Sequence, residues 1–232
     1  MCIRDRTITD LSTSPSLGSA KRVVELVNNP DGSSTITYEF NIENFGNVDI
    51  DNIQLSDDLA SVFAPCLVEV IRITSDDFTV NPLFNGATVF DMLTGNDLLQ
   101  VGDKGAVLLT INVNSCQGNT GPFDNTATVS GETPSGDPIE DVTTEGSEPD
   151  PNGDGNPDED EPTTVQFDFT SAIGIAKNVI SIISNADGST LVTYEFNIEN
   201  FGNQELTDVQ VTDNLGVVFA PCTVEVLSLI HI

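Results

Sequence analysis

The sequence predicts an all-β protein made of tandem copies of one domain, and three observations lead to this. The segment 37–47, TYEFNIENFGN, returns unchanged at 193–203, and a gapless match pairs Gly18 with Gly174 and Val70 with Val226, a constant offset of 156 residues (174 − 18). A period this long indicates whole domains in series rather than a short-repeat solenoid. Apolar runs are short and separated by Gly, Asn, Asp and Pro, and no segment has a convincing helical period.

The first complete copy begins at Gly18 with a strand expected over 20–27. The turn 29–32, NPDG, follows, because Pro presets one backbone dihedral and Gly accepts a positive φ. Residues 34–43 then alternate between polar and apolar, which predicts a strand with one buried face. The inward side chains of that strand are Ile36, Tyr38, Phe40 and Ile42.

Further strands are expected along the rest of the copy. After the turn 44–47 comes a strand at 48–56, whose Ile53 and Leu55 point inward. The remaining candidates are 67–73, 78–80, 87–90, 106–113 and 125–129. Seven or more short strands in one domain predict a two-sheet β-sandwich of the immunoglobulin-like type.

Several motifs of the first copy give a more specific resemblance. They are Gly18-x-Ala20-Lys21, Thr37-Tyr38-x-Phe40, Asn44-x-Gly46-Asn47, Asp57 after a strand, and the segment 125–129, NTATV. Together they resemble the conserved-repeat domains of unknown function in large bacterial surface proteins, which have an immunoglobulin-like fold. The resemblance covers one whole copy and the first half of another. It implies a secreted or cell-surface multidomain protein with a stalk or adhesive role, whose partners are neighbouring repeats and a surface ligand, protein or glycan.

The sequence divides into six segments. The ends, 1–6 and 227–232, resemble one DNA tag of sequencing-library preparation read in both directions, so they are expected to be a scar on a fragment of a longer gene. Residues 7–17 are expected to be the tail of a preceding repeat, 18–147 the first repeat, 148–162 an acidic linker, and 163–226 an incomplete second repeat. An open half-sandwich leaves an apolar face uncovered, so 163–226 should fold incompletely alone.

Charge and composition exclude several functions. The net charge of −30, from 37 acidic and 7 basic residues, would repel a nucleic-acid backbone, and no apolar run is long enough to span a membrane. Outside the scar the chain has no His, phosphate-binding glycine loop, metal-type cysteine pair or serine elbow, so we do not expect an enzyme. The alternative is a carbohydrate- or protein-binding module attached to a secreted enzyme. The lack of Trp and the inward phase of Tyr38 and Tyr194 weigh against a sugar platform.

The acidic segment 148–162 carries a calcium-like spacing. Oxygen-bearing side chains alternate around a glycine that permits a sharp bend, as in calcium loops. The expected Ca²⁺ ligands are Asp150, Asn152, Asp154, Asn156, Asp158 and Glu161. Pro149, Pro162 and the strand-like 165–169 disfavour an EF-hand, and the segment more closely resembles the Asp-rich calcium linkers of extracellular repeat proteins. Calcium would then stiffen the joint between domains; the alternative is a proline-stiffened spacer that binds nothing tightly.

Cys66 and Cys116 are expected to form a disulfide. Cys222 corresponds to Cys66, and its partner would fall at position 272 (116 + 156), beyond residue 232. A bridge would stabilise the domain and would need an oxidising compartment, in keeping with the extracellular resemblance. The alternative is two buried free thiols.

Lys21, Asp57 and Asn125 are expected to face the core together. Lysine is scarce, yet Lys21 and Lys177 take the same place in both copies. Counted in twos, each of the three shares its phase with apolar neighbours, and buried polar groups of this kind should meet one another. We therefore expect a self-formed amide bond between Lys21 and Asn125, assisted by Asp57; this arrangement resembles crosslinked domains of bacterial pili and adhesins. The alternatives are a hydrogen-bonded trio, or a Lys21 that reaches the surface.

Overall fold

The computed structural model describes residues 12–114 and 116–227. The tag-like residues 1–6 and 228–232, and part of the expected tail 7–17, lie outside the described residues. The chain is all-β, as predicted, with two single-turn helices that the sequence analysis did not anticipate: α1 (Leu59–Val62) and α2 (Leu215–Val218). Asp58 caps α1 by accepting a hydrogen bond from the Ser61 amide.

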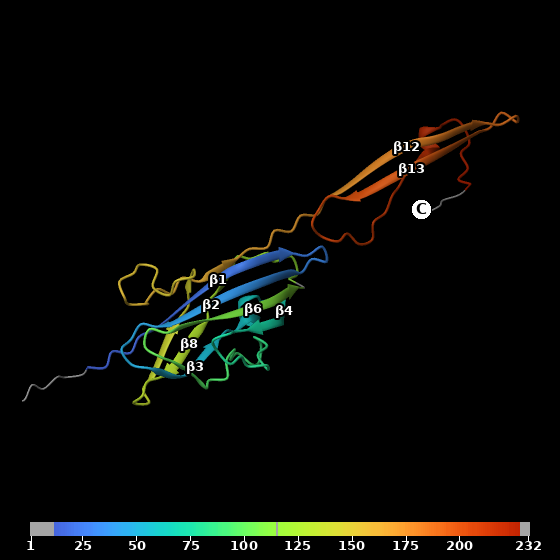
Figure 1. Ribbon diagram of the computed structural model, residues 1–232. Helices are drawn as coiled ribbons and strands as arrows, with labels where there is room; N and C mark the ends of the chain where they lie inside the picture. The colour runs from blue at the N-terminus through green and yellow to red at the C-terminus, as the bar shows by residue number, and fades with distance from the viewer. Residues whose placement is uncertain (1–11, 115, 228–232) are drawn as a thin grey trace, which may run out of the picture.

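One five-stranded sheet forms the first layer of the first repeat (Figure 1). Its order is β10 (Thr144–Glu145), β1 (Leu17–Asn28), β2 (Ser34–Asn44), β6 (Lys104–Asn114) and β4 (Leu67–Thr74). The pairs are antiparallel except β1 with β10, which is parallel. β2 is buried at every second residue, as its alternating sequence predicts.

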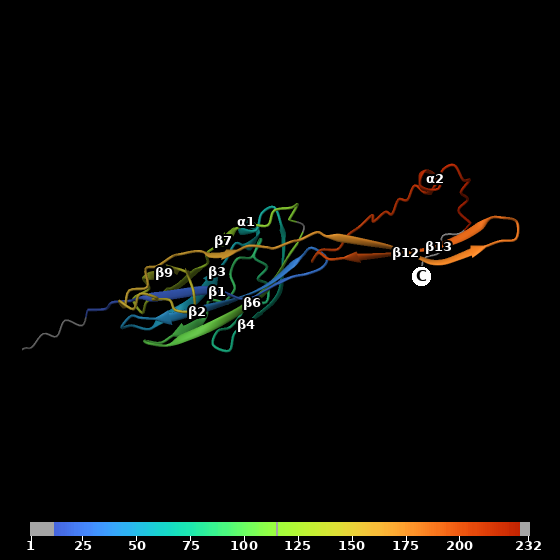
Figure 2. The ribbon, with the colours of Figure 1, turned by 90° about the horizontal axis from the view of Figure 1, so that it is seen from above.

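A four-stranded sheet forms the second layer (Figure 2). Its order is β5 (Asp97–Leu99), β3 (Ile50–Ser56), β8 (Thr128–Glu132) and β9 (Pro138–Val142). The core lies between the two layers. It joins the inward residues of β2 and β6 to those of β3 and β8, among them Tyr38, Phe40, Leu109, Leu55 and Val129. The first repeat is therefore a two-sheet sandwich.

A β-bulge in β1 limits the alternation expected for this strand. Lys21 pairs with Phe40 and Val23 with Tyr38, but the register shifts between Val23 and Glu25. Val27 has the same phase as Lys21 when the strand is counted in twos, but the bulge turns it outward and it is 42% exposed. Lys21 precedes the bulge and keeps its core-facing position. The bulge therefore reverses the inward and outward positions only in the residues that follow it, from Glu25 on.

Three of the expected strands differ from the structure. The segments 78–80 and 87–90 are not strands; only Val80 forms an isolated bridge, with Leu93. At 87–90 the side chain of Asn85 accepts hydrogen bonds from the amides of Ala87, Thr88 and Val89, which folds the chain into a turn instead. The expected strand 125–129 is divided between β7 (Phe123–Asn125) and β8.

The residues after the acidic segment return to the first repeat, which moves the expected domain boundary. β11 (Thr163–Val165) pairs antiparallel with β7. Phe167 is buried, with its ring 5.3 Å from that of Phe123 and 6.3 Å from that of Phe63. Residues 163–167 thus complete the first sandwich and do not open the second copy.

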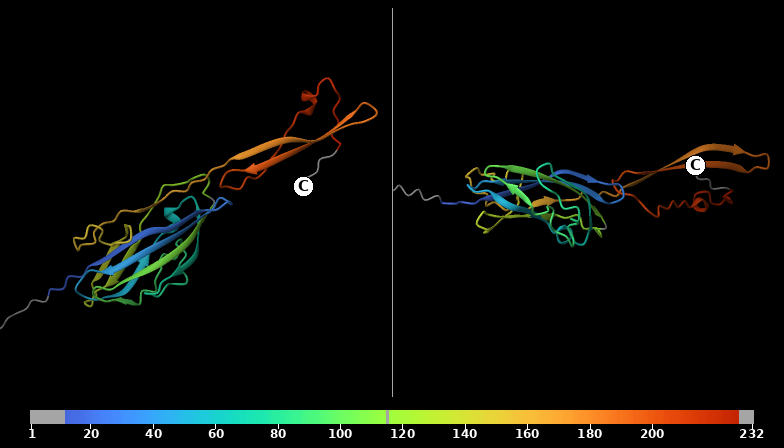
Figure 3. Two further views of the ribbon diagram at one scale, coloured as in Figure 1. Left: turned by 45° about the horizontal axis from the view of Figure 1, so that its top comes forward. Right: turned by 60° about the horizontal axis from the view of Figure 1, so that its bottom comes forward.

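The acidic segment 148–162 is accordingly a connection within one domain and not a linker between two. Its two ends meet at one atom, because the Gly146 amide and the Thr163 hydroxyl both donate to the Lys21 carbonyl, at 3.0 and 2.8 Å. Its middle lies against β1, where a Cβ added to Gly18 would come 2.6 Å from Pro157. Figure 3 shows the returning chain alongside this strand.

The second copy is described as a hairpin of β12 (Ile173–Ser184) and β13 (Thr190–Asn200), followed by α2. Its register repeats that of β1 and β2, including the bulge, since Lys177 pairs with Phe196 and the shift lies between Val179 and Ser181. Within residues 12–114 and 116–227 no other strand pairs with this hairpin. Ile173 is 57% exposed whereas its counterpart Leu17 is 3% exposed, so the apolar face of this copy is uncovered.

Candidate functional site

Three polar side chains from separate elements meet inside the first sandwich. Lys21 comes from β1, Asp57 from the connection between β3 and α1, and Asn125 from the end of β7. All three are buried, with exposed fractions of 0%, 3% and 0%. Lys21 Nζ donates to Asp57 Oδ2 at 2.7 Å, and Asn125 Nδ2 donates to the same oxygen at 3.1 Å. We call these three residues the Lys-Asp-Asn cluster.

Backbone hydrogen bonds hold each member in place. The Lys21 carbonyl accepts from Gly146 and Thr163, which fixes the middle of β1. The Asp57 amide donates to the Phe90 carbonyl at 3.0 Å, just before the one-turn helix. Asn125 is opposite Thr163 in the β7 and β11 pair. The chain that returns after the acidic segment therefore helps, through Thr163, to hold Lys21 and Asn125 in place.

Burial of the cluster disfavours charge, although two aromatic rings face the Lys21 amine. Lys21 Nζ lies 4.5 Å from the ring centre of Tyr38 and 5.1 Å from that of Phe40. Burial lowers the pKa of the Lys21 amine, and the Asp57 carboxylate opposes this shift only in part. Burial also raises the pKa of Asp57, against the opposing influence of Lys21 and Asn125. Both shifts favour a neutral amine beside a protonated carboxyl group.

Three buried oxygens at the cluster have no hydrogen-bond partner among the described residues. They are Asp57 Oδ1, Asn125 Oδ1 and the Tyr38 hydroxyl. Buried polar atoms without partners are rare, because the lost hydration is not replaced. A proton on Asp57 would supply a donor that a carboxylate lacks. The neutral state itself is supported by the directions of the pKa shifts of Lys21 and Asp57.

The second copy contains two thirds of the same cluster. Lys177 Nζ donates to Asp213 Oδ2 at 2.6 Å and lies 4.1 Å from the Tyr194 ring centre. These residues correspond to Lys21, Asp57 and Tyr38 through the offset of 156. The side chains of Lys177 and Asp213 are 35% and 25% exposed. The counterpart of Asn125 would be at position 281 (125 + 156), beyond residue 232.

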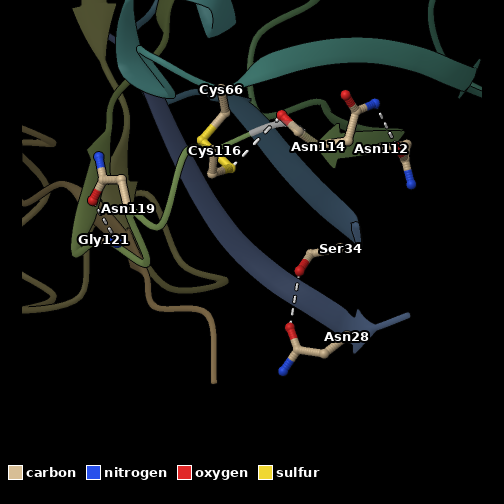
Figure 4. Close-up of a disulfide and its surroundings, with 8 residues drawn as sticks. All are labelled: Asn28, Ser34, Cys66, Asn112, Asn114, Cys116, Asn119 and Gly121. Atoms are coloured by element: carbon tan, nitrogen blue, oxygen red, sulfur yellow. Dashed lines mark hydrogen bonds between the residues drawn. A yellow bond between two sulfur atoms is a disulfide. The ribbon is translucent and has the colours of Figure 1, made fainter. Parts of the chain in front are cut away.

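The predicted disulfide between Cys66 and Cys116 is confirmed (Figure 4). It joins the residue before β4 to the segment after β6, two strands that pair antiparallel with Leu67 opposite Asn114. The bridge thus closes one end of the β4 and β6 pair. Cys222 is exposed and is the free cysteine among the described residues.

The expected calcium ligands form hydrogen bonds within the acidic segment and at its base. Asp150 accepts from the amides of Gly153 and Gly155, and Asn156 donates to Asp158. Glu161 instead accepts from the Thr144 hydroxyl, at the base of the segment. In the described part of the chain, no group of three or more His, Cys, Asp or Glu side chains is placed to hold a metal ion. Calcium binding by this segment stays a prediction of the sequence.

Asp141 is a perturbed carboxyl group that the sequence analysis did not single out. It lies on β9, which packs beside β1, and accepts a hydrogen bond from the Ser19 hydroxyl at 2.7 Å. Burial raises the pKa of Asp141 to about 6, from an ordinary value of 3.8, although the Ser19 bond acts the other way. The alternation of exposed and partly buried residues in β9 could have indicated that Asp141 is partly buried, but that strand was not predicted.

The raised pKa of Asp141 predicts a pH dependence of stability. The folded state binds the proton more tightly than the unfolded state, so this contribution is full below pH 3.8 and is lost as the pH rises towards about 6. Asp141→Asn should remove the dependence while keeping an acceptor for Ser19. Urea denaturation of both proteins between pH 4 and pH 7 checks this. Parallel pH profiles for the two proteins would show that Asp141 does not contribute.

Comparisons with known proteins do not assign the chain to a family. No family model matches it, and no curated protein matches it. Among solved structures it is similar to an exo-β-N-acetylglucosaminidase of Vibrio harveyi, both as an inactive mutant and in complex with N-acetylglucosamine. Each alignment has 12% identity and a TM-score of 0.32, and covers 57% of this chain and 18% of the enzyme's chain. The described residues contain no helix that is long and apolar enough to cross a membrane.

Proposed function

We infer that the chain is a structural repeat module of a secreted or cell-surface bacterial protein, serving as a spacer or as a segment of an adhesin. The observation that carries this is the repetition of one architecture. The β12 and β13 hairpin reproduces the register, the bulge and the lysine position of β1 and β2. What recurs between the copies is the frame of the domain together with its lysine and aspartate pair, as expected of a building unit.

The arrangement of polar groups supports the same role. The three residues of the Lys-Asp-Asn cluster are buried inside the sandwich and do not lie in an open cleft. A site for an external substrate needs access to its reacting groups. The Cys66–Cys116 disulfide supports an oxidising environment such as the cell exterior. The immediate partners would then be neighbouring repeats of the same protein.

A glycan array distinguishes this role from the rival role of a carbohydrate-binding module. The full chain should bind no glycan above background, because a spacer acts through its fold. Phe90, at 40% exposure, is an aromatic ring that the first repeat presents to solvent. Saturable binding that is lost in Phe90→Ala would overturn the spacer role and favour the binding module.

Calcium enters this proposal as a stabiliser of the first repeat. Because the acidic segment starts and ends beside Lys21, an ion bound there would stabilise that domain by mass action rather than set an angle between domains. Titration calorimetry of the full chain should show heat at about millimolar Ca²⁺. The variant Asp150→Asn/Asp154→Asn should not. A wild-type titration without calcium-dependent heat contradicts this part of the proposal.

A further inference from the structure

We propose that Lys21 and Asn125 of the first repeat join covalently, through an amide bond between Lys21 Nζ and Asn125 Cγ. Both side chains are wholly buried and share one partner, Asp57 Oδ2, at 2.7 and 3.1 Å. An amine and a carboxamide that both hydrogen-bond to one atom are held as neighbours, so the reaction does not pay the entropy cost of an encounter. The proposal goes beyond the spacer role and does not depend on it.

The reaction needs no oxidant, reductant or cofactor. The Lys21 amine attacks the Asn125 carbonyl carbon, and the new C–N bond gives a tetrahedral intermediate. The bond from that carbon to Nδ2 then breaks, and the nitrogen leaves as ammonia. One amine and one primary amide thus become one secondary amide and one ammonia, so atoms and electrons balance. The three side chains are buried from solvent, which limits competing hydrolysis.

Asp57 is placed to move the protons. The amine must be neutral to attack, and Asp57 is the carboxyl group that can take the proton from the Lys21 ammonium. The protonated Asp57 can then hydrogen-bond to the developing oxyanion, and it passes one proton from the attacking Lys21 nitrogen to the leaving Nδ2, so that the leaving group is ammonia. A half-turn of the Asn125 amide exchanges Oδ1 with Nδ2 and brings the carbonyl oxygen to Asp57. The direction of both pKa shifts supports this neutral starting state.

The unpaired oxygens favour the crosslinked product over the separate side chains. Before the bond forms, Asn125 Oδ1 and Asp57 Oδ1 are buried without partners. A protonated Asp57 that donates to the new amide oxygen leaves fewer unpaired oxygens. The bond also removes the buried amine, whose desolvation is otherwise unfavourable. The product therefore leaves fewer buried polar groups unpaired than the separate side chains do.

The second copy supplies a control within the same chain. Lys177 and Asp213 repeat the amine and carboxyl pair at 2.6 Å, but among residues 12–114 and 116–227 no asparagine side chain is hydrogen-bonded to that pair. Lys177 should therefore stay a free amine. The chain should lose one ammonia and not two.

Mass spectrometry of the reduced, denatured full chain tests the proposal. The expected result is a mass one ammonia below that of the sequence, together with a branched peptide in which Lys21 is joined to Asn125. The branched peptide is decisive, because cyclisation at Asn85-Gly86 or Asn152-Gly153 also releases ammonia but leaves linear peptides. An unmodified mass, or an ammonia loss mapped to linear peptides, overturns the proposal.

Variants of the full chain separate chemistry from folding. Lys21→Met and Asp57→Asn should abolish the ammonia loss, whereas Lys177→Met and Asp213→Asn should retain it. Formation of the Cys66–Cys116 disulfide reports whether each variant has folded. Ammonia loss that persists in folded Lys21→Met would contradict the assignment. The peptide map of the unaltered chain decides the question even if a variant fails to fold.

Discussion

Asp57→Ala is expected to lower the free energy of unfolding of the first repeat by about 1–3 kcal/mol, because it leaves the Lys21 amine buried without its hydrogen-bond partner. It also removes the group that assists the proposed amide bond. The measurement is urea denaturation of the full chain, followed by hydrogen exchange of peptides from β3 and β6, whose sequences do not recur in the second copy. These peptides report on the first sandwich alone.

The second copy gives a matched control for this variant. Asp213→Ala breaks the equivalent pair, in which Lys177 and Asp213 are 35% and 25% exposed. A partly solvated pair contributes only about 0–1 kcal/mol, so this variant should change stability little. Equal effects of Asp57→Ala and Asp213→Ala would contradict the importance of burial at the cluster.

A double variant separates an ion pair from a covalent bond. Replacing a buried ion pair with apolar residues of similar size is often neutral or stabilising. Lys21→Met/Asp57→Leu should therefore recover wild-type stability if the cluster is only an ion pair. If Lys21 and Asn125 are joined, the double variant also loses a crosslink and should stay less stable than the wild type.

Removal of the disulfide has the second large expected effect. Cys66→Ser/Cys116→Ser should cost about 4 kcal/mol on the chain-entropy model, for a bridge between residues 50 positions apart. Cys222→Ser is the control, because Cys222 is exposed and should change stability by no more than about 0.5 kcal/mol. A loss below about 1 kcal/mol for the double variant would mean that the pairing of β4 with β6 already confines this loop.

These two effects are expected to interact. The disulfide loop, 66–116, lies wholly within the segment between Lys21 and Asn125. A chain already joined at those two residues has a restricted unfolded state, so the disulfide adds less to it. Loss of the disulfide should consequently cost more in Lys21→Met than in the wild type.

Much of the first sandwich could be predicted from its sequence. The alternation of 34–43 gave β2 because one face packs on the core while the other does not. The offset of 156 placed Lys177 as the counterpart of Lys21. The phase of Lys21 held because the residue lies before the bulge, whereas that of Val27 did not. A bulge depends on the partner strand and leaves no clear local signal.

The domain boundary could not be predicted, for a different reason. The acidic, proline-rich composition of 148–162 is typical of linkers, yet composition does not say where the chain goes next. The signal was Val165 and Phe167, an alternating apolar pair directly after the acidic residues. Val165 lies in β11, which pairs with β7, and the side chains of Val165 and Phe167 are both buried against the first core. Pairing between distant strands is decided by tertiary packing, so local sequence does not assign it to one domain or the other.

Force spectroscopy on the full chain, held by its two ends, tests most directly whether the first repeat is built to resist extension. If Lys21 and Asn125 are joined, the 104 residue-to-residue steps between them (125 − 21) are shielded, which withholds about 370 Å of contour length. Unfolding of the wild type should then release only the chain outside this segment. Lys21→Met should release the shielded length as well, apart from the part enclosed by the disulfide. Equal release by the wild type and Lys21→Met would contradict the account.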